Sequence, residues 1–319
     1  MHDTTRPATL LTPRILIPFV ICTLIWGSTW IVIRGQLGEV PPTWSVAYRF
    51  AIASVAMFAF AAWKRERLSL TLAAHGLALA IGLLQFVGNF NFVYRAEAYI
   101  TSGLVAVMFA LLIIPNTLLG RVFLDQRTTP RFIVGASVAV LGVGLMIAHE
   151  YRAASLGSTA ALTGAALTLG GVLSASIANV TQGMRLARAQ TMAVMLAWAM
   201  LYGALMNAGW AVLTVGPPSY VASFAYLGGV TYLGIMASAV AFPLYFNIIR
   251  EIGPSQAAWS SVLVPVIAML ISTLVEGYRW SPLAIAGAVV AALGLVIALR
   301  SRPPRPVVSC NTVPVVVED

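Results

Sequence analysis

The sequence predicts an all-α integral membrane protein with ten transmembrane helices arranged as two inverted five-helix repeats. Three observations carry this prediction: the composition, the spacing of the apolar stretches and a pattern that recurs in both halves. Of 319 residues, 60% are hydrophobic and 9% are charged, and the mean hydropathy is +0.89. Soluble domains carry about 25% charged residues. The charges are too few to cover a globular surface, which excludes a disordered chain and a disulfide-rich secreted module.

A helix needs about 20 apolar residues to cross a bilayer, and ten stretches of this kind follow one another through short connections. Prolines mark several of the predicted ends, as at Pro42, Pro130 and Pro282. The Pro-rich tail, residues 301–319, is expected to be disordered and cytosolic. The predicted spans are residues 15–33, 43–63, 72–93, 98–123, 131–148, 162–184, 191–214, 222–247, 255–275 and 281–299.

The placement of the basic residues predicts the orientation. The net charge is +9. With the N-terminus inside, fourteen of the nineteen basic residues fall in inner segments and four in outer loops, the asymmetry that sets membrane topology. We therefore expect a multi-pass protein of the bacterial inner membrane with both termini cytoplasmic, lipid as its surroundings and no nucleic acid as partner. Cys310 would then lie in a reducing compartment, so no disulfide with Cys22 is expected.

A pattern in the two halves predicts an internal repeat. Before the fifth span an acid and a proline, Asp125 and Pro130, precede two glycines, Gly135 and Gly142. The tenth span repeats this order with the same proline-to-glycine spacings, in Glu276, Pro282, Gly287 and Gly294. A unit of five helices inserts its second copy upside down, the arrangement of many secondary transporters. The predicted repeats are residues 1–150 and 151–300. Together with Gly144, these glycines are expected to let helices pack closely.

Two strings resemble a known family. IWGSTWIVIRGQLGEVPPTWSVAYRF, with WGS on the first helix and YRF on the second, resembles the opening of EamA-type members of the drug/metabolite transporter superfamily. AFPLYFNIIREIGPSQAAWSSVLVPVIAMLISTLVEG resembles the closing repeat. The resemblance implies ten helices in two inverted repeats and export of metabolites or amino acids. It also implies a central cavity lined mainly by helices one, three, four, six, eight and nine, with five and ten peripheral.

Polar and aromatic side chains inside spans are the candidate lining, because a polar group in lipid must face protein or water. Hydrogen bonds to the helix backbone and core packing are the structural alternatives. Trp44, Trp63, Trp280 and Tyr278 stand at span ends and are expected in the interfacial belt. The candidate substrate-binding residues are Trp26, Ser28, Trp30, Gln85, Asn89, Ser102, Ser176, Asn179, Ser238, Tyr245, Gln256, Trp259 and Ser260.

The charged residues limit the chemistry. No Asp, Glu or Lys lies deep in a predicted span, which argues against drug-cation export and carboxylate-based proton antiport. Arg49 lies about five residues inside its helix, so we expect it to extend to the outer interface, with a gate or an anion contact as the alternative. Glu97 and Arg95 are expected to pair weakly on an outer loop. Pro115 and Pro265 could be hinges or static kinks.

The sequence therefore predicts a secondary transporter that exports small neutral or zwitterionic metabolites, such as amino acids, by alternating access. A proton-coupled antiporter and an uptake carrier are the alternatives within transport, and a channel and an intramembrane enzyme are remote ones. Neither catalytic residues nor a metal or cofactor site are expected, because the spans lack clustered acids and histidines. The solute, the driving ion and the oligomeric state are not defined by the sequence.

Overall fold

The computed structural model describes residues 12–38, 40–123, 129–153, 158–182, 184–252 and 260–300, and within these ranges the chain is helical with no strand. Within the described ranges, eight helices are long and apolar enough to cross a membrane. Two shorter apolar helices, Leu263–Glu276 and Pro282–Ala298, follow them. The all-helical membrane class is thus confirmed. The tail, residues 301–319, lies outside the described residues.

Several of the long helices are interrupted by short π-helical or 3₁₀ segments, labelled η. The elements are α1 (Pro13–Arg34), α2 (Pro42–Trp63), α3 (Leu72–Ile81), η1 (Gly82–Asn89), α4 (Phe90–Ala96), α5 (Ser102–Phe109), η2 (Ala110–Leu112), α6 (Ile113–Phe123), α7 (Pro130–Ala153), α8 (Ser158–Gln182), α9 (Arg185–Arg188), α10 (Met192–Thr214), α11 (Phe224–Gly234), η3 (Ile235–Val240), α12 (Ala241–Ile252), α14 (Ser260–Ile271), η4 (Ser272–Glu276) and α15 (Pro282–Leu299).

Several helices begin at a proline, as the sequence predicts. Pro13, Pro42 and Pro282 occupy the first turns of α1, α2 and α15, where a missing N–H costs nothing because first-turn N–H groups have no intrahelical partner. Before α15, the Ser281 hydroxyl also accepts a hydrogen bond from the backbone N–H of Ala284 at 3.1 Å. The predicted helix boundaries follow from this local chemistry.

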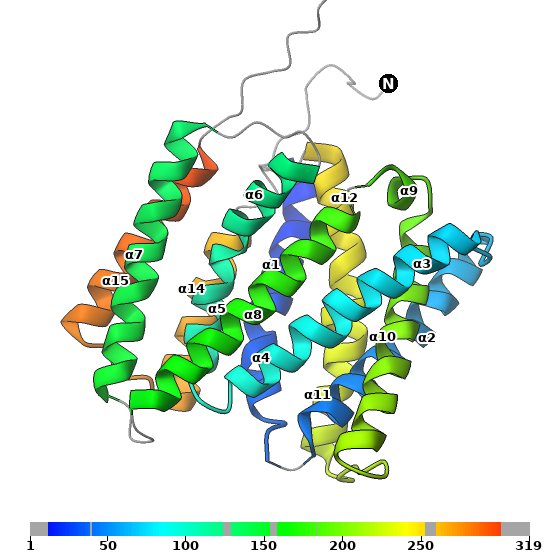
Figure 1. The fold of residues 1–319 in the computed structure, drawn as a ribbon, viewed down its shortest axis with the longest axis horizontal. Helices are drawn as coiled ribbons and strands as arrows, with labels where there is room; N and C mark the ends of the chain where they lie inside the picture. The colour runs from blue at the N-terminus through cyan, green and yellow to red at the C-terminus, as the bar shows by residue number, and fades with distance from the viewer. Residues whose placement is uncertain are drawn as a thin grey trace, which may run out of the picture.

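The helices run side by side as a bundle (Figure 1). α7 and α15 form one flank, α2, α3 and α10 form the opposite flank, and α1, α5, α8 and α14 lie between them. The predicted spans that the family resemblance places at the periphery, residues 131–148 and 281–299, correspond to α7 and α15.

Glycines bring α7 and α15 into backbone contact. A Cβ on Gly135 would come 2.7 Å from the carbonyl oxygen of Gly294, and one on Gly142 would come 2.6 Å from that of Gly287. Neither helix could keep this separation with larger side chains, so the predicted packing role of these four glycines holds. Gly144 was wrongly included, because a Cβ there would meet nothing within 4 Å.

The surface carries large apolar side chains, as expected for a protein in lipid. Leu72, Leu213 and Phe224 are each more than 85% exposed, which would be costly in water. Trp63 and Trp280 are exposed at helix ends, in keeping with an interfacial belt. Trp44 and Tyr278 were wrongly assigned to that belt. Trp44 is 4% exposed and packs with Val40 and Tyr226, and Tyr278 is 7% exposed.

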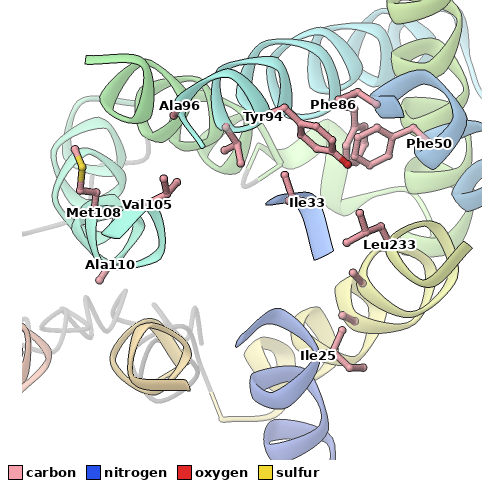
Figure 2. Packing of buried hydrophobic residues seen from close by; sticks show 14 of the residues in the cluster. Ile25, Ile33, Phe50, Phe86, Tyr94, Ala96, Val105, Met108, Ala110 and Leu233 are labelled. Atoms are coloured by element: carbon pink, nitrogen blue, oxygen red, sulfur yellow. The ribbon is translucent and has the colours of Figure 1, made fainter. Parts of the chain in front are cut away.

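The buried core is continuous through the centre of the bundle. Phe50, Phe86 and Tyr94 lie next to one another, with Ile33 of α1 nearby (Figure 2). All four side chains are 2% exposed or less. The centre is therefore built from rings and branched side chains of α1, α2, η1 and α4.

Candidate functional site

Aromatic rings from four helical regions meet at the centre. Trp26 of α1 packs edge-on against Phe242 and Tyr245 of α12, with ring centroids 5.6 and 4.9 Å apart. Phe242 reaches Phe86 of η1 at 6.1 Å, and Phe86 lies 4.6 Å from Phe50 of α2. Such pairs favour edge-on and tilted geometries. The rings therefore connect helices from both halves of the chain.

A second group of residues combines aromatic rings with an unsatisfied amide. Trp30 of α1 lies 5.2 Å from Phe109 of α5. A Cβ on Gly171 of α8 would come 3.3 Å from the Phe109 ring and 3.4 Å from Asn89 Oδ1. Trp30, Asn89, Phe109 and Gly171 thus form one contiguous group, which we term the central cluster.

Several buried polar atoms at these helices have no hydrogen-bond partner. They include Nε1 of Trp30, Oδ1 of Asn89, Oε1 of Gln85 and Oγ of Ser176. Buried polar groups in proteins are nearly always paired, so each exception needs an explanation. Unpaired donors and acceptors beside aromatic rings can hold a small solute with polar and apolar parts.

Other predicted site residues are bonded to the protein itself. The Trp26 Nε1–H donates to the carbonyl of Ala237 at 3.2 Å. Ser28 lies 2.7 Å from the Tyr232 hydroxyl and also donates to its own helix backbone. Asn179 donates to Asn116 Oδ1 at 3.5 Å, and Tyr245 contacts Ser260 by hydrogen bond. Gln256 and Trp259 lie outside the described residues.

Arg49 does not extend to the membrane interface, which corrects the sequence prediction. The side chain is 2% exposed. Its Nε–H donates to Ser238 Oγ at 3.2 Å, and its Cζ lies 4.2 Å above the centroid of Phe90. Nη1 has no hydrogen-bond partner. The guanidinium is stabilised inside the bundle by a hydroxyl and an aromatic face, within reach of η3 and α4.

The predicted hinge prolines lie beside irregular helix. Pro115 stands in the first turn of α6, directly after the 3₁₀ turn η2. Pro265 lies inside α14, which continues into the π-helix η4. Further π-helices interrupt the third span at η1 and the eighth at η3. Such interruptions are concentrated at functional sites and bends.

An amide group that sequence analysis did not single out joins α2, α4 and α10. Asn91 Nδ2 donates to Asn207 Oδ1 at 2.6 Å and to the carbonyl of Val87 at 2.9 Å. Thr43 donates to Asn91 Oδ1 at 3.1 Å. Asn207 is fully buried. An asparagine in the middle of the seventh apolar stretch was the available signal. The Asn91 amide therefore bonds to its own helical segment and to α2 and α10.

Glu97 was wrongly expected to pair with Arg95. The Arg95 guanidinium instead lies 5.1 Å from the centroid of Trp210. Glu97 is fully buried, and neither carboxylate oxygen has a hydrogen-bond partner. Nearby, Glu276 of η4 accepts from the Ser102 hydroxyl at 2.6 Å and lies 3.6 Å from Arg34 Nε. This end of the bundle thus contains two acids, Glu97 and Glu276. The Ser102 hydroxyl and the Arg34 guanidinium are partners of Glu276.

No group of three or more His, Cys, Asp or Glu side chains that could hold a metal ion occurs among the described residues. Cys22 is buried and not in a disulfide, and Cys310 lies outside the described ranges. The site is therefore described entirely by aromatic rings, amides, hydroxyls and one guanidinium.

The fold and this site define a multi-pass helical membrane protein with a mixed aromatic and polar centre. The sequence model of the EamA-like transporter family matches residues 14–148 and 162–300. The chain belongs to the EamA-like transporter family, and the resemblance noted in the sequence is confirmed.

Several relatives are named as transporters or efflux pumps. The chain is 24% identical to the "Probable amino-acid metabolite efflux pump" of Salmonella typhimurium, covering 87% of this chain and 92% of the relative. It is 27% identical to the "Uncharacterized inner membrane transporter YedA" of Escherichia coli K12, covering 90% and 92%. It is 22% identical to the "Uncharacterized transporter YoaV" of Bacillus subtilis, covering 82% and 88%. These names point to a transporter rather than an enzyme.

A solved crystal structure shares the fold. It superposes with a TM-score of 0.66 at 19% sequence identity, covering 88% of this chain and 95% of that one. At this identity the likeness shows the arrangement of helices alone.

Proposed function

We propose that this chain is a secondary transporter that exports small neutral or zwitterionic metabolites, such as amino acids, by alternating access. The observation that carries the proposal is the central cluster, where unpaired Trp30 and Asn89 atoms stand beside the Phe109 ring. A zwitterionic solute with an apolar side chain would satisfy both features. A relative named as a probable amino-acid metabolite efflux pump agrees with this solute class.

Alternating access calls for two exchangeable halves, and the α7–α15 contact supports an inverted repeat. By sequence, Gly135 corresponds to Gly287 and Gly142 to Gly294. In the structure Gly135 contacts Gly294 and Gly142 contacts Gly287. Each contact is the image of the other under exchange of the halves, as a two-fold axis between the helices requires. The family model likewise matches in two separate segments.

The repeat gives ten spans when Leu263–Glu276 and Pro282–Ala298 are counted with the eight longer helices. The irregular segments agree with this count. η1 and η3 interrupt the third helix of each half. Pro115 and Pro265 both lie in the fourth. We infer that these paired irregularities are the segments that move during alternating access, with both prolines as hinges; their occurrence in both halves supports this.

Within the proposed site, the unpaired atoms of Trp30, Gln85, Asn89 and Ser176 are the solute contacts. Arg49 adds a positive charge from the side of α2, where it can meet a solute carboxylate. Trp26, Ser28, Ser238 and Tyr245 hold neighbouring helices in place through the bonds described above. The distribution of basic residues puts both termini in the cytoplasm of a bacterial cell, with Glu97 and Glu276 at the outer end.

Transport into membrane vesicles tests the proposal. Inverted vesicles from cells producing the chain are given a mixture of isotopically labelled amino acids, and the contents are measured by mass spectrometry. We expect saturable accumulation of one or a few amino acids, lowered at least tenfold by Trp30→Ala or Asn89→Ala. Matched controls are Trp63→Ala, an exposed tryptophan, and Thr163→Ala, whose hydroxyl bonds its own helix.

Other outcomes separate the alternatives. Accumulation only in right-side-out vesicles would overturn export and identify an uptake carrier. Flux that does not saturate would indicate a channel. If Trp63→Ala lowered accumulation as much as Trp30→Ala did, the central cluster would not be the solute site.

A further inference from the structure

Glu97 is an acid buried without a hydrogen-bond partner. It follows directly after α4, outside the spanning segments Leu72–Ala96 and Ser102–Phe123. Its side chain is fully buried, and both carboxylate oxygens are unpaired. An ionised carboxylate in such surroundings is costly, so the group either gains a partner or takes up a proton.

The groups around Glu97 come from three other elements. Glu276 of η4 faces it, as do Arg34 of α1 and Arg49 of α2. Burial raises the pKa of the Glu97 carboxyl well above its ordinary value of 4.5, and the negative charge of Glu276 adds to this rise. The two arginines lower the pKa, but by less. Neighbouring α8 contains no charged residue.

Glu276, unlike Glu97, has three donor groups close to its carboxylate. Ser102 offers its hydroxyl at 2.6 Å and its backbone N–H at 3.3 Å, at the first residue of α5. Arg34 Nε lies 3.6 Å away. Two neighbouring carboxylates do not both ionise readily when one of them is buried. Glu97 is the buried member and its oxygens have no donor, so we expect Glu97 to carry the proton.

The contacts of Glu276 join the two halves of the chain. Arg34 and Ser102 belong to the first matched segment of the family and Glu276 belongs to the second. Breaking these contacts is therefore part of separating the halves at this end. We call Arg34, Ser102 and Glu276 the end latch.

Further buried polar groups lie near Glu97. The Tyr94 hydroxyl donates to Gln36 Oε1 at 2.9 Å and lies beside the Arg49 guanidinium. Gln36 and Arg49 are each 2% exposed, and Nε2 of Gln36 and Nη1 of Arg49 are unpaired. Tyr94 lies beside Phe50 and Phe86 of the core (Figure 2). Arg49 is thus a second charged side chain, beside Glu97, that is buried and has an unpaired polar atom.

We propose that Glu97 is a proton-binding site, and that the proton on Glu97 keeps the end latch closed. This inference rests on the proposed alternating-access function and adds to it a control of the outer end by pH. When the latch closes, the Glu97 carboxylate takes one proton from water at this end. When the latch opens, water reaches the carboxylate and the same proton leaves. A metal cation is a poorer occupant, because Arg34 and Arg49 both repel it and a proton requires no additional ligands.

The direction of the pH dependence follows from linkage. The closed state binds the proton more tightly than the open, hydrated state does. Closure is therefore favoured below the raised pKa of Glu97 and is lost as the pH rises through it. One bound proton changes the closed-to-open ratio by at most about tenfold per pH unit.

Distances between spin labels across the end latch test this. Tyr99 and Val275 are exposed residues near Ser102 and Glu276 in the chain, one in each matched segment of the family. Each is replaced by a labelled cysteine in the full chain, with Cys22→Ala and Cys310→Ser, in lipid nanodiscs. The pH is varied from about 5 to about 9, the range of raised carboxyl pKa values. We expect a single short distance at low pH and a growing longer distance as the pH rises.

Glu97→Gln mimics the protonated carboxyl and is expected to keep the short distance at every pH. Glu66→Gln makes the same change near the opposite ends of the helices, after α2, and should behave as the unchanged protein. An equal pH response in Glu97→Gln would overturn the proposal. So would a response that depends on sodium concentration at fixed pH.

A second readout does not depend on the folding of the variant. We expect infrared spectra of the unchanged protein at low pH to contain the carbonyl band of a protonated carboxyl, and this band should weaken as the longer distance grows. Loss of the band without a change in distance would overturn the proposal. Because these measurements use no solute, they stand apart from the vesicle assay. If solute accumulates but the spin-label distance does not respond to pH, the proton-binding site is contradicted and the proposed export function is not.

Discussion

Gly142 of α7 lies directly against Gly287 of α15. A Cβ on Gly142 would come 2.6 Å from the Gly287 carbonyl oxygen, and one on Gly287 would come 2.7 Å from that of Gly142. The contact is reciprocal, and it fixes the separation of the two helices.

Replacing Gly142 by alanine should therefore destabilise the protein. The added methyl group meets backbone atoms of Ala291 and Gly287, which cannot rotate away. Overpacking of this kind costs about 1–3 kcal/mol. We expect a lower apparent melting temperature in detergent, followed by tryptophan fluorescence. Gly144→Ala is the matched control two residues away, where the methyl group meets nothing within 4 Å. An equal loss in both variants would contradict the packing role.

Asn91 and Asn207 should be energetically coupled through the hydrogen bond between their side chains. Replacing Asn91 by alanine removes the donor to Asn207 Oδ1, and replacing Asn207 removes one of the two acceptors of Asn91 Nδ2. An unpaired buried group costs about 1–3 kcal/mol. The double variant should lose less stability than the sum of the single variants. A double-mutant cycle by thermal unfolding measures this difference. Strict additivity would show that the amides do not act together.

Gly171→Ala should narrow the proposed solute site without unfolding the protein. The methyl group would lie 3.3–3.4 Å from Phe109 and Asn89, a tight but tolerable approach. We expect accumulation of larger amino acids to fall several-fold in inverted vesicles, and that of the smallest ones to remain. Gly209→Ala, where the space is open, is the control. Uniform loss for all amino acids, with normal folding, would argue against a role in solute size.

Arg49→Gln should move the opening of the end latch to higher pH. Arg49 lowers the pKa of Glu97, so removing its charge raises this pKa and keeps the proton bound further up the pH scale. Arg49→Lys retains the charge and should leave the midpoint near its original pH. Lysine cannot reproduce the planar stack on Phe90, so solute accumulation should fall in both variants. The spin-label distances and the vesicle assay report these effects separately. A midpoint unmoved by Arg49→Gln would contradict the charge interaction.

Signals in the local sequence were sufficient to predict where the helices lie. Apolar runs of bilayer length, with prolines at their first turns, predicted α1, α2 and α7 closely, because these signals act within one helix. Glycine spacing likewise identified the contact faces of α7 and α15. Gly144 was misassigned because sequence spacing alone does not show which face of a helix meets a neighbour.

The candidate site depended far more on packing. Trp30 and Asn89 were expected to serve the same site, yet only the fold shows that Phe109 and Gly171 connect them. Trp26 and Ser28 were predicted by the same reasoning, but their polar atoms are bonded to Ala237 and Tyr232. Whether a polar atom stays unpaired depends on groups more than two hundred residues away in the chain.

The sequence by itself determined that this protein is a bundle of membrane helices of the EamA-like family, because hydropathy, helix ends and glycine spacing are properties of neighbouring residues. Only the tertiary structure decided where the charged side chains Arg49 and Glu97 lie. Arg49 lies inside the bundle on Phe90, and Glu97 is buried facing Glu276. The energy of a charge depends on its burial and on partners from distant helices, and neither is written in the local sequence.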